Sequence, residues 1–168
     1  KLLPNPDDAA ILLAYMAALV QHQGRKFTWC PLLQGVPGNG KTLITSCMRR
    51  AIGSRYVHDA RSSQITGRFN AWLVGKILIV VDDMRVSQDR NSAMEILKPM
   101  ITASEGIEIE GKGIAQRSER ICANFMLTSN HRDAIPKTAD DRRFAVFFTA
   151  QQDPADLARD GMGPEYFV

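Results

Sequence analysis

Gly35-Val36-Pro37-Gly38-Asn39-Gly40-Lys41-Thr42 is the stretch of this sequence that decides the fold. It follows an apolar run from Thr28 to Leu33 and opens an amphipathic run that reaches Ile52, which predicts a strand, a glycine-rich loop and a helix. Glycine tolerates positive φ and a close backbone approach to an anion, and the free N–H groups of a helix N-terminus attract negative charge. The spacing is that of a phosphate-binding loop, and we expect it to bind a nucleoside triphosphate.

Two side chains of this loop have specific roles in the predicted site. We expect the Lys41 ammonium to contact the β- and γ-phosphates and the Thr42 hydroxyl to be one ligand of an octahedral Mg²⁺. The candidate nucleotide-binding residues are the loop and the residue after it: Gly35, Val36, Pro37, Gly38, Asn39, Gly40, Lys41, Thr42 and Leu43.

The composition is ordinary for a globular domain and excludes several classes of protein. The chain has 168 residues, a net charge of +3 and a pI near 8.9. This length predicts one domain with a real core, and the small basic surplus permits nucleic-acid binding without arguing for it. Cys30, Cys47 and Cys122 are too scattered for a zinc site, which favours reduced thiols. No apolar run has membrane-spanning length, so no membrane partner is expected.

Three segments are expected along the chain. Residues 1–24 contain a helix start at Asn5-Pro6-Asp7-Asp8 and should form a helix that packs on the core. Residues 25–150 should form the phosphate-binding core, and residues 151–168, which contain prolines and glycines, a weakly structured tail or linker. The first residue is not Met, and we expect the chain to be a fragment of a longer protein.

Strands and helices alternate within the core. Apolar runs predict strands, and helical spacing predicts the helices between them. The predicted strands cover residues 56–58, 77–81, 121–129 and 144–148, the helices residues 62–75 (capped by Ser62 or Ser63) and 91–101, and a β-hairpin residues 106–114. This alternation predicts an α/β fold with a mainly parallel sheet and helices on both faces.

Two carboxylates follow the buried apolar strand 77–81. Asp82 is the candidate to hold Mg²⁺, and Asp83 is the candidate to polarise the water that attacks the γ-phosphate. Asn130 ends the strand expected beside this one, where its amide can donate to the γ-phosphate and accept from the water. Ligands of open α/β sheets bind at the carboxyl ends of the strands, so these side chains should meet the phosphate loop.

Four segments together resemble, in order, the A, B, B′ and C motifs of superfamily-three helicases: residues 35–42, 77–83, 107–117 and 128–130. These helicases are AAA+-like motors of small viruses, phages and plasmids, and the likeness is greatest to the phage and plasmid primase–helicase branch. The resemblance implies an ATP hydrolase that unwinds DNA during replication. It further implies a P-loop NTPase sheet ordered 5-1-4-3-2 with a β-hairpin insertion, and a hexameric ring with ATP and Mg²⁺ between neighbouring subunits. Single-stranded DNA would be the partner, and the cytoplasm of a bacterium or phage-infected cell the location.

The resemblance also assigns residues outside the nucleotide site. In these helicases the hairpin carries a basic residue that grips the DNA backbone in the central channel, and Lys112 matches it. Gly113 stands where some relatives have a second basic residue, and Arg117 is a weaker candidate for DNA contact. An arginine finger in an Asp-Arg-x-Phe context is matched by Arg142, with Arg143 as the near alternative.

The hairpin carries acidic side chains that would repel DNA. Glu108 and Glu110 alternate with two isoleucines and point away from them. If the turn runs from Gly111 to Ile114, Glu108 lies opposite Arg117, and a cross-strand ion pair would neutralise it. We take this pair as a hypothesis that the register of the hairpin tests.

Two other functions share the phosphate loop. A small-molecule P-loop kinase would need an arginine-rich lid and an acceptor pocket, and it would leave Asn130 and the hairpin without a purpose. A nucleotide-switched loader or initiator would use the same ATP site and hairpin but would not unwind long duplexes. The sequence barely separates this second alternative from a helicase, and strand displacement is the property that does.

Overall fold

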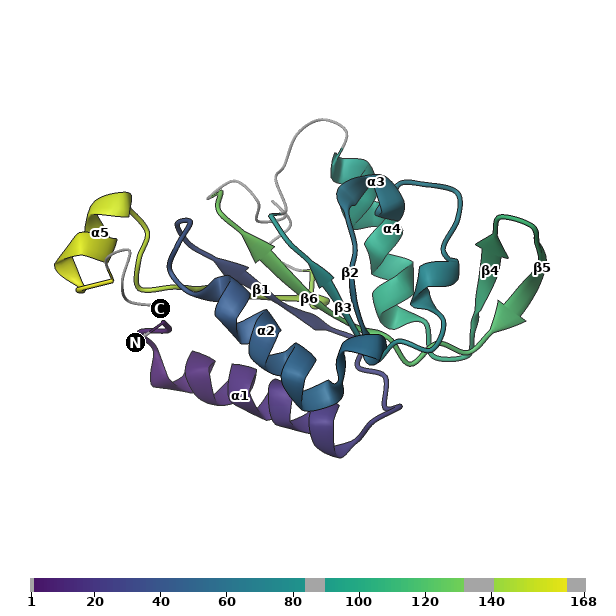
Figure 1. Cartoon of the computed structure of the whole chain (residues 1–168), viewed down its shortest axis with the longest axis horizontal. Coiled ribbons are helices and arrows are strands. Elements are labelled where there is room, and N and C mark those ends of the chain that lie inside the picture. The colour runs from purple at the N-terminus through teal and green to yellow at the C-terminus, as the bar shows by residue number, and fades with distance from the viewer. Residues whose placement is uncertain (1, 84–89, 132–140, 163–168) are drawn as a thin grey trace.

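The structure, a computed structural model, describes residues 2–83, 90–131 and 141–162 (Figure 1). Its central sheet consists of β1 (Cys30–Gln34), β2 (Val57–Asp59), β3 (Leu78–Val81), β6 (Asn124–Ser129) and β7 (Phe144–Phe148). The strands lie in the order β2-β3-β6-β1-β7, and every neighbouring pair is parallel. If these five strands are numbered 1 to 5 in chain order, the sheet read from β7 to β2 has the expected order 5-1-4-3-2. The fold class is therefore confirmed.

Helices cover both faces of the sheet. α1 (Pro6–Gln21) and α2 (Lys41–Ile52) pack on one face, and α3 (Ser62–Ile65) and α4 (Arg90–Thr102) pack on the other. Successive residues of a strand point to opposite faces, so Leu32 joins the α4 side of the core and its neighbour joins the α1 side. Because both faces are covered, the inner strands β1, β3 and β6 are buried along their whole length.

α1 begins where the sequence predicts a helix start. Asn5 is its N-cap, and the Asn5 Oδ1 accepts from the N–H of Asp7 at 2.9 Å. The hydroxyl of Tyr15 donates to the carbonyl of Phe125 at 2.7 Å and so ties the buried face of α1 to β6. α1 is the longest described helix, and neither it nor any other described helix has the length and apolar surface of a membrane span.

Residues 62–75 do not form the single helix that the sequence predicts. α3 ends after four residues, and a 3₁₀ turn, η2 (Ala71–Leu73), follows after a gap. The N-cap of α3 is Arg61, not Ser62 or Ser63. Within the gap, Asn70 hydrogen-bonds to a distant strand through both its backbone and its side chain. These tertiary contacts override the local helical spacing.

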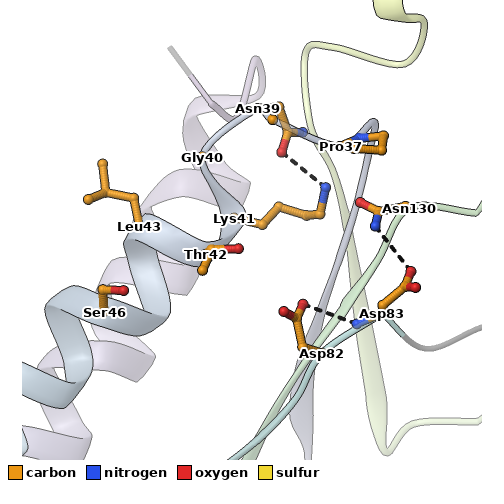
Figure 2. A pocket seen from close by; sticks show the side chains of 11 residues that line it. Pro37, Asn39, Gly40, Lys41, Thr42, Leu43, Ser46, Asp82, Asp83 and Asn130 are labelled. Carbon is orange, nitrogen blue, oxygen red and sulfur yellow. Dashed lines mark hydrogen bonds between the residues drawn. The ribbon is translucent and has the colours of Figure 1, made fainter. Parts of the chain in front are cut away.

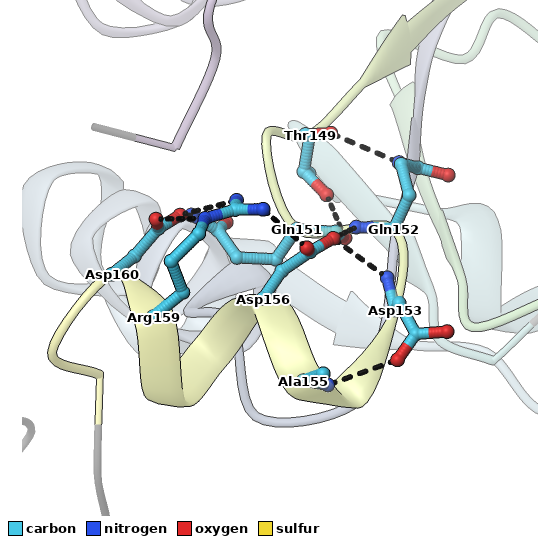
Figure 3. A network of polar contacts seen from close by, with 8 residues as sticks. All are labelled: Thr149, Gln151, Gln152, Asp153, Ala155, Asp156, Arg159 and Asp160. Atoms are coloured by element: carbon cyan, nitrogen blue, oxygen red, sulfur yellow. Dashed lines mark hydrogen bonds and ion pairs between the residues drawn. The ribbon is translucent and has the colours of Figure 1, made fainter.

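The segment after residue 150 is more ordered than the sequence predicts. Asp153 caps α5 (Pro154–Arg159), and its carboxylate accepts from the N–H of Ala155 at 3.0 Å. The Asp156 carboxylate accepts from the N–H groups of Gln152 and Asp153, both at 2.9 Å. Figure 3 shows this network, which joins α5 to the end of β7. Residues 163–168 of the predicted tail lie outside the described part of the chain.

The predicted hairpin is present as a separate antiparallel sheet of β4 (Ile107–Gly111) and β5 (Ile114–Glu119). Figure 1 shows it projecting from the α4 side of the molecule, away from the five-stranded sheet. Its turn has the expected register, since Gly111 lies opposite Ile114. A bulge between Ile109 and Gly111 then shifts the pairing by one residue.

The bulge overturns the predicted ion pair between Glu108 and Arg117. Arg117 lies opposite Ile109, and Ser118 lies opposite Glu108. A shift of one residue moves a side chain to the other face of the hairpin, so the two charged groups do not meet. Instead, the Arg117 guanidinium binds the Glu119 carboxylate at 2.7 Å, and the Glu108 carboxylate accepts from Gln116 Nε2 at 2.6 Å.

Candidate functional site

A cavity of about 460 Å³ opens at the carboxyl ends of β1, β3 and β6 (Figure 2). The phosphate loop and the first turns of α2 form one side, and residues that follow β3 and β6 form the other. The lining residues are Pro37, Gly38, Asn39, Gly40, Lys41, Thr42, Leu43, Ser46, Asp82, Asp83 and Asn130. The structure therefore brings most of the predicted loop together with both predicted carboxylates and the predicted amide.

Gly35 and Val36 are not part of the cavity lining, but they shape the loop behind it. A Cβ atom on Gly35 would stand 1.8 Å from the hydroxyl oxygen of Thr149, so no other residue fits there. Gly38 and Gly40 have φ angles of +82° and +96°, a left-handed conformation that glycine adopts without steric cost. The loop thus turns tightly and leaves the free N–H groups at the start of α2 beside the cavity.

The Lys41 ammonium is buried among oxygen atoms of its own loop. Its Nζ donates to the carbonyls of Gly35 and Val36, both at 2.8 Å, and to Oδ1 of Asn39 at 3.0 Å. Burial lowers the pKa of Lys41 to about 8, while the two carboxylates that follow β3 act in the opposite direction. The loop therefore holds a cation at the cavity wall without pairing it to a carboxylate.

Asp82 and Asp83 follow β3, and residues at the end of the neighbouring strand β6 orient both carboxylates. The Thr128 hydroxyl donates to the Asp82 carboxylate, which also accepts from the N–H of Asp83 at 3.0 Å. The Asn130 amide donates to Asp83 Oδ1 at 3.1 Å, and His131 Nε2 lies 3.7 Å from the same oxygen. Asp83 has a φ of +51°, a left-handed conformation that is uncommon outside glycine and marks a constrained backbone.

Ser46, Thr128 and His131 belong to the site, although the sequence assigned them no role; of the three, only Thr128 falls in a segment with a motif resemblance, residues 128–130. Ser46 lies one turn after Thr42 on α2, so helical spacing was a signal that could have found it. Thr128 and His131 act on side chains at the end of another strand. No local spacing marks such contacts, because they depend on how β3 and β6 pair.

The oxygen donors of the cavity fit a magnesium ion. Magnesium takes oxygen ligands and is commonly bound by one or two protein groups together with substrate phosphates. The hydroxyl of Thr42 and the carboxylate of Asp82 both line the cavity and could supply these groups. Among the described residues, no cluster of three or more His, Cys, Asp or Glu side chains offers an all-protein metal site.

Arg142 and Arg143 lie at the opposite end of the sheet from the cavity. The carbonyl of Arg143 accepts from the N–H of Cys30, the first residue of β1, at 2.8 Å. The phosphate loop follows the last residue of β1, and a strand of this length spans about 17 Å. The Arg143 guanidinium contacts Asp141 at 3.2 Å, whereas Arg142 is exposed and forms no ion pair with any described residue.

Lys112 lies in the turn of the hairpin, where its side chain is exposed. Gly113 follows it with a φ of +75°, as the tight turn requires. Lys112 forms no ion pair within the part of the chain that the structure describes, whereas Arg117 is neutralised by Glu119. Of the predicted DNA-contacting side chains, Lys112 therefore presents the uncompensated charge.

These features define a P-loop-type α/β fold with a polar site at the carboxyl ends of its strands. A family model matches residues 33–143, and the chain belongs to that family, which is described as a family of unknown function, DUF5906. No match was found among curated proteins.

Several solved structures share this fold. Two apo structures of the NrS-1 C-terminal region match with TM-scores of 0.75 and 0.69, at 19% and 22% identity over 89% and 83% of this chain. A structure of JCV helicase with a bound acetamide compound matches with a TM-score of 0.57, at 12% identity over 95% of this chain. The chain spans 36% and 34% of the two NrS-1 chains and 47% of the JCV helicase chain. At such identities the similarity shows a common fold.

Proposed function

We propose that this chain is the ATP-driven motor domain of a superfamily-three DNA helicase or translocase that acts in phage or plasmid replication, in the cytoplasm of the bacterial cell. The observation that carries the proposal is the cavity in which the phosphate loop meets Asp82, Asp83 and Asn130. An exposed lysine on a separate hairpin is the second feature that a DNA motor requires. The fold shared with a protein named JCV helicase supports the same proposal.

The loop is suited to bind the triphosphate of ATP. The N–H groups at the start of α2 would contact the phosphates, and Lys41 would move from the loop carbonyls to the β- and γ-phosphates. Because neutral oxygens hold this ammonium, a phosphate gains a charged hydrogen bond without breaking an ion pair. A Mg²⁺ ion held by Thr42 and Asp82 would neutralise charge on the phosphates.

Hydrolysis is assigned to the residues that follow β3 and β6. The Asp83 carboxylate accepts a hydrogen bond from the water that attacks the γ-phosphate, and ADP and inorganic phosphate result. The Asn130 amide, which donates to Asp83 Oδ1 at 3.1 Å, fixes the direction of that carboxylate. Many members of superfamily three have Glu at this position, and the shorter Asp83 makes such support more important.

The position of the arginines favours a ring in which subunits complete one another's sites. Arg142 is separated from its own cavity by the length of β1, so it can stabilise transition-state charge only on the ATP of a neighbour. Arg143, the alternative finger, is already engaged by Asp141 in its own subunit. A hexamer, as in superfamily three, would place one ATP at each junction.

The hairpin lysine would supply the contact with DNA. An exposed ammonium binds the phosphate backbone without regard to sequence. Such binding weakens as the salt concentration rises, because the release of counterions from the DNA then contributes less free energy. This kind of grip suits translocation along single-stranded DNA. Lys112 is therefore assigned to the DNA backbone, while Glu108 is satisfied by Gln116 within the hairpin.

Steady-state ATP hydrolysis with and without single-stranded DNA tests the proposed function. The chain should hydrolyse ATP in a Mg²⁺-dependent reaction that DNA stimulates, and Lys41→Ala should abolish nucleotide binding. No small-molecule acceptor should be needed, which separates a motor from a kinase. Normal ATP binding by Lys41→Ala, or hydrolysis that DNA does not change, would count against the proposal.

A further inference from the structure

The hairpin of β4 and β5 is a two-stranded sheet, and a structure of this size is at best marginally stable alone. The orientation of the hairpin relative to the core must therefore be set by its contacts with other elements. The Ile109 side chain, 1% exposed, anchors one face in the core beneath α4. Ile107 is partly buried against the same cluster, and neither isoleucine side chain hydrogen-bonds the edge of β4 that does not pair with β5.

Asn70 lies at the edge of β4 that does not pair with β5, and three of its polar groups form hydrogen bonds with β4. Its backbone N–H donates to the carbonyl of Glu110 at 3.0 Å, and its side-chain Oδ1 accepts from the N–H of Glu110 at 2.8 Å. Its Nδ2 donates to the carbonyl of Glu108 at 2.9 Å. One asparagine thus pairs with β4 as a neighbouring strand would.

We propose that Asn70 is the positioning residue that fixes the direction of the hairpin and so presents Lys112 to DNA. The inference rests on the proposed function, because it deepens the role of the same hairpin. Asn70 lies between α3 and η2, and α3 packs against α4, which itself leads into β4. The hairpin is therefore tied to the core along the chain through α4 and laterally through Asn70.

The ion pair beside Asn70 does not explain the same anchoring. Arg68 Nε lies 2.7 Å from the Glu110 carboxylate, but the arginine side chain is 78% exposed. Exposed ion pairs are weak and screened by salt, whereas a hydrogen-bonded amide that spans two residues of a strand constrains direction. The pair accounts for the acidic Glu110, whose carboxylate contacts Arg68. Arg68→Ala is therefore the matched control for Asn70→Ala.

Hydrogen exchange measures the anchor without any assumption about function. In Asn70→Ala, the amides of residues 107–119 should exchange roughly fivefold to tenfold faster than in the wild type, because the two side-chain hydrogen bonds from residue 70 to β4 are lost. Asn70→Asp keeps the shape and the acceptor but sets an oxygen against the Glu108 carbonyl, so it should behave as Asn70→Ala does. Arg68→Ala should exchange within about twofold of the wild type.

Hydrolysis assays then separate a positioning role from a general structural one. Both Asn70 variants should keep the basal ATPase and the KM for ATP within about twofold, since Asn70 contacts no residue of the nucleotide cavity. The DNA-stimulated part of the rate should fall at least about fivefold, as it should in Lys112→Ala. Arg68→Ala should retain it.

The outcomes distinguish this inference from the proposed function. Wild-type exchange in both Asn70 variants overturns the inference, whatever the ATPase assays give. Faster exchange with full DNA stimulation overturns it as well, because the anchor would then not serve DNA contact. Loss of basal and stimulated hydrolysis together, in both variants, replaces positioning by a general structural role. If the wild type shows no DNA stimulation, the proposed function fails, while the exchange result still decides whether Asn70 holds the hairpin.

Discussion

The pH dependence of nucleotide binding tests how the phosphate loop holds its lysine. Lys41 has a pKa of about 8 in the free chain, because burial disfavours the ammonium. A bound triphosphate would lie beside Nζ and favour the charged form, which returns the pKa toward its ordinary value of about 10.4. Above pH 8, binding must then take up a proton, and the affinity should fall as the pH rises.

The size of this effect follows from the two pKa values. With a pKa of about 8, roughly one tenth of the free protein lacks the proton at pH 7 and roughly nine tenths at pH 9. The dissociation constant for nucleotide should therefore rise about tenfold between pH 7 and pH 9.

The stability of the free chain responds to pH in the opposite direction to the nucleotide affinity. Because the folded pKa lies below the unfolded one, the contribution of Lys41 to stability rises with pH between about 8 and 10.4.

Calorimetric titration with a non-hydrolysable ATP analogue at pH 7, 8 and 9 measures the effect and leaves both carboxylates that act on Lys41 in place. Lys41→Arg is the matched variant, because a guanidinium stays charged throughout, so its affinity should be weaker but independent of pH. Lys26 is the control residue, since burial also lowers its pKa to about 8. Its Nζ donates to the Ala123 carbonyl at the far end of β6, so Lys26→Arg should leave the pH dependence unchanged. A constant affinity from pH 7 to pH 9 would refute this reasoning.

Three further predictions concern other parts of the chain. Lys112→Ala should leave the basal ATPase unchanged and reduce both DNA stimulation and the salt dependence of DNA binding, which titration at several salt concentrations measures. Thr149→Val should destabilise the chain by about 1–3 kcal/mol, because it removes the buried acceptor for the Asn39 amide, whereas Thr149→Ser should cost much less; thermal unfolding compares the two. Arg142→Ala should be inactive alone but regain ATPase when mixed with Lys41→Ala subunits, and no recovery in a mixture shown to co-assemble would argue against a finger acting in trans.

The apolar strands are the most predictable elements of the fold. β3 is an uninterrupted apolar run that is buried at every residue. β7 is an edge strand with Phe148 exposed, yet its apolar run still predicts the observed bounds, Phe144–Phe148. The order of the strands in the sheet cannot be predicted in the same way, since an apolar run does not indicate which strands it pairs with. That order came from the resemblance to superfamily-three motifs, and the structure confirms it.

The features that the sequence does not predict depend on contacts between distant residues. Asn70 leaves the helical pattern because it bonds to residues 38 and 40 positions further along the chain. The hairpin register changes at a bulge that no turn signal marks, which places Arg117 opposite Ile109. In the site, the loop motif predicts that Lys41 binds phosphate, but the three oxygens that hold it follow only from the folded loop.

Strand displacement on a long forked duplex tests the central claim most directly, because it separates a motor from a loader or initiator with the same ATP site. Protein containing this chain should displace the strand with ATP and Mg²⁺, and not with a non-hydrolysable ATP analogue. Lys41→Ala and Lys112→Ala should each abolish displacement. DNA-stimulated ATP hydrolysis without displacement of the long strand, or equal displacement with the analogue, would contradict the assignment of this chain as a translocating motor.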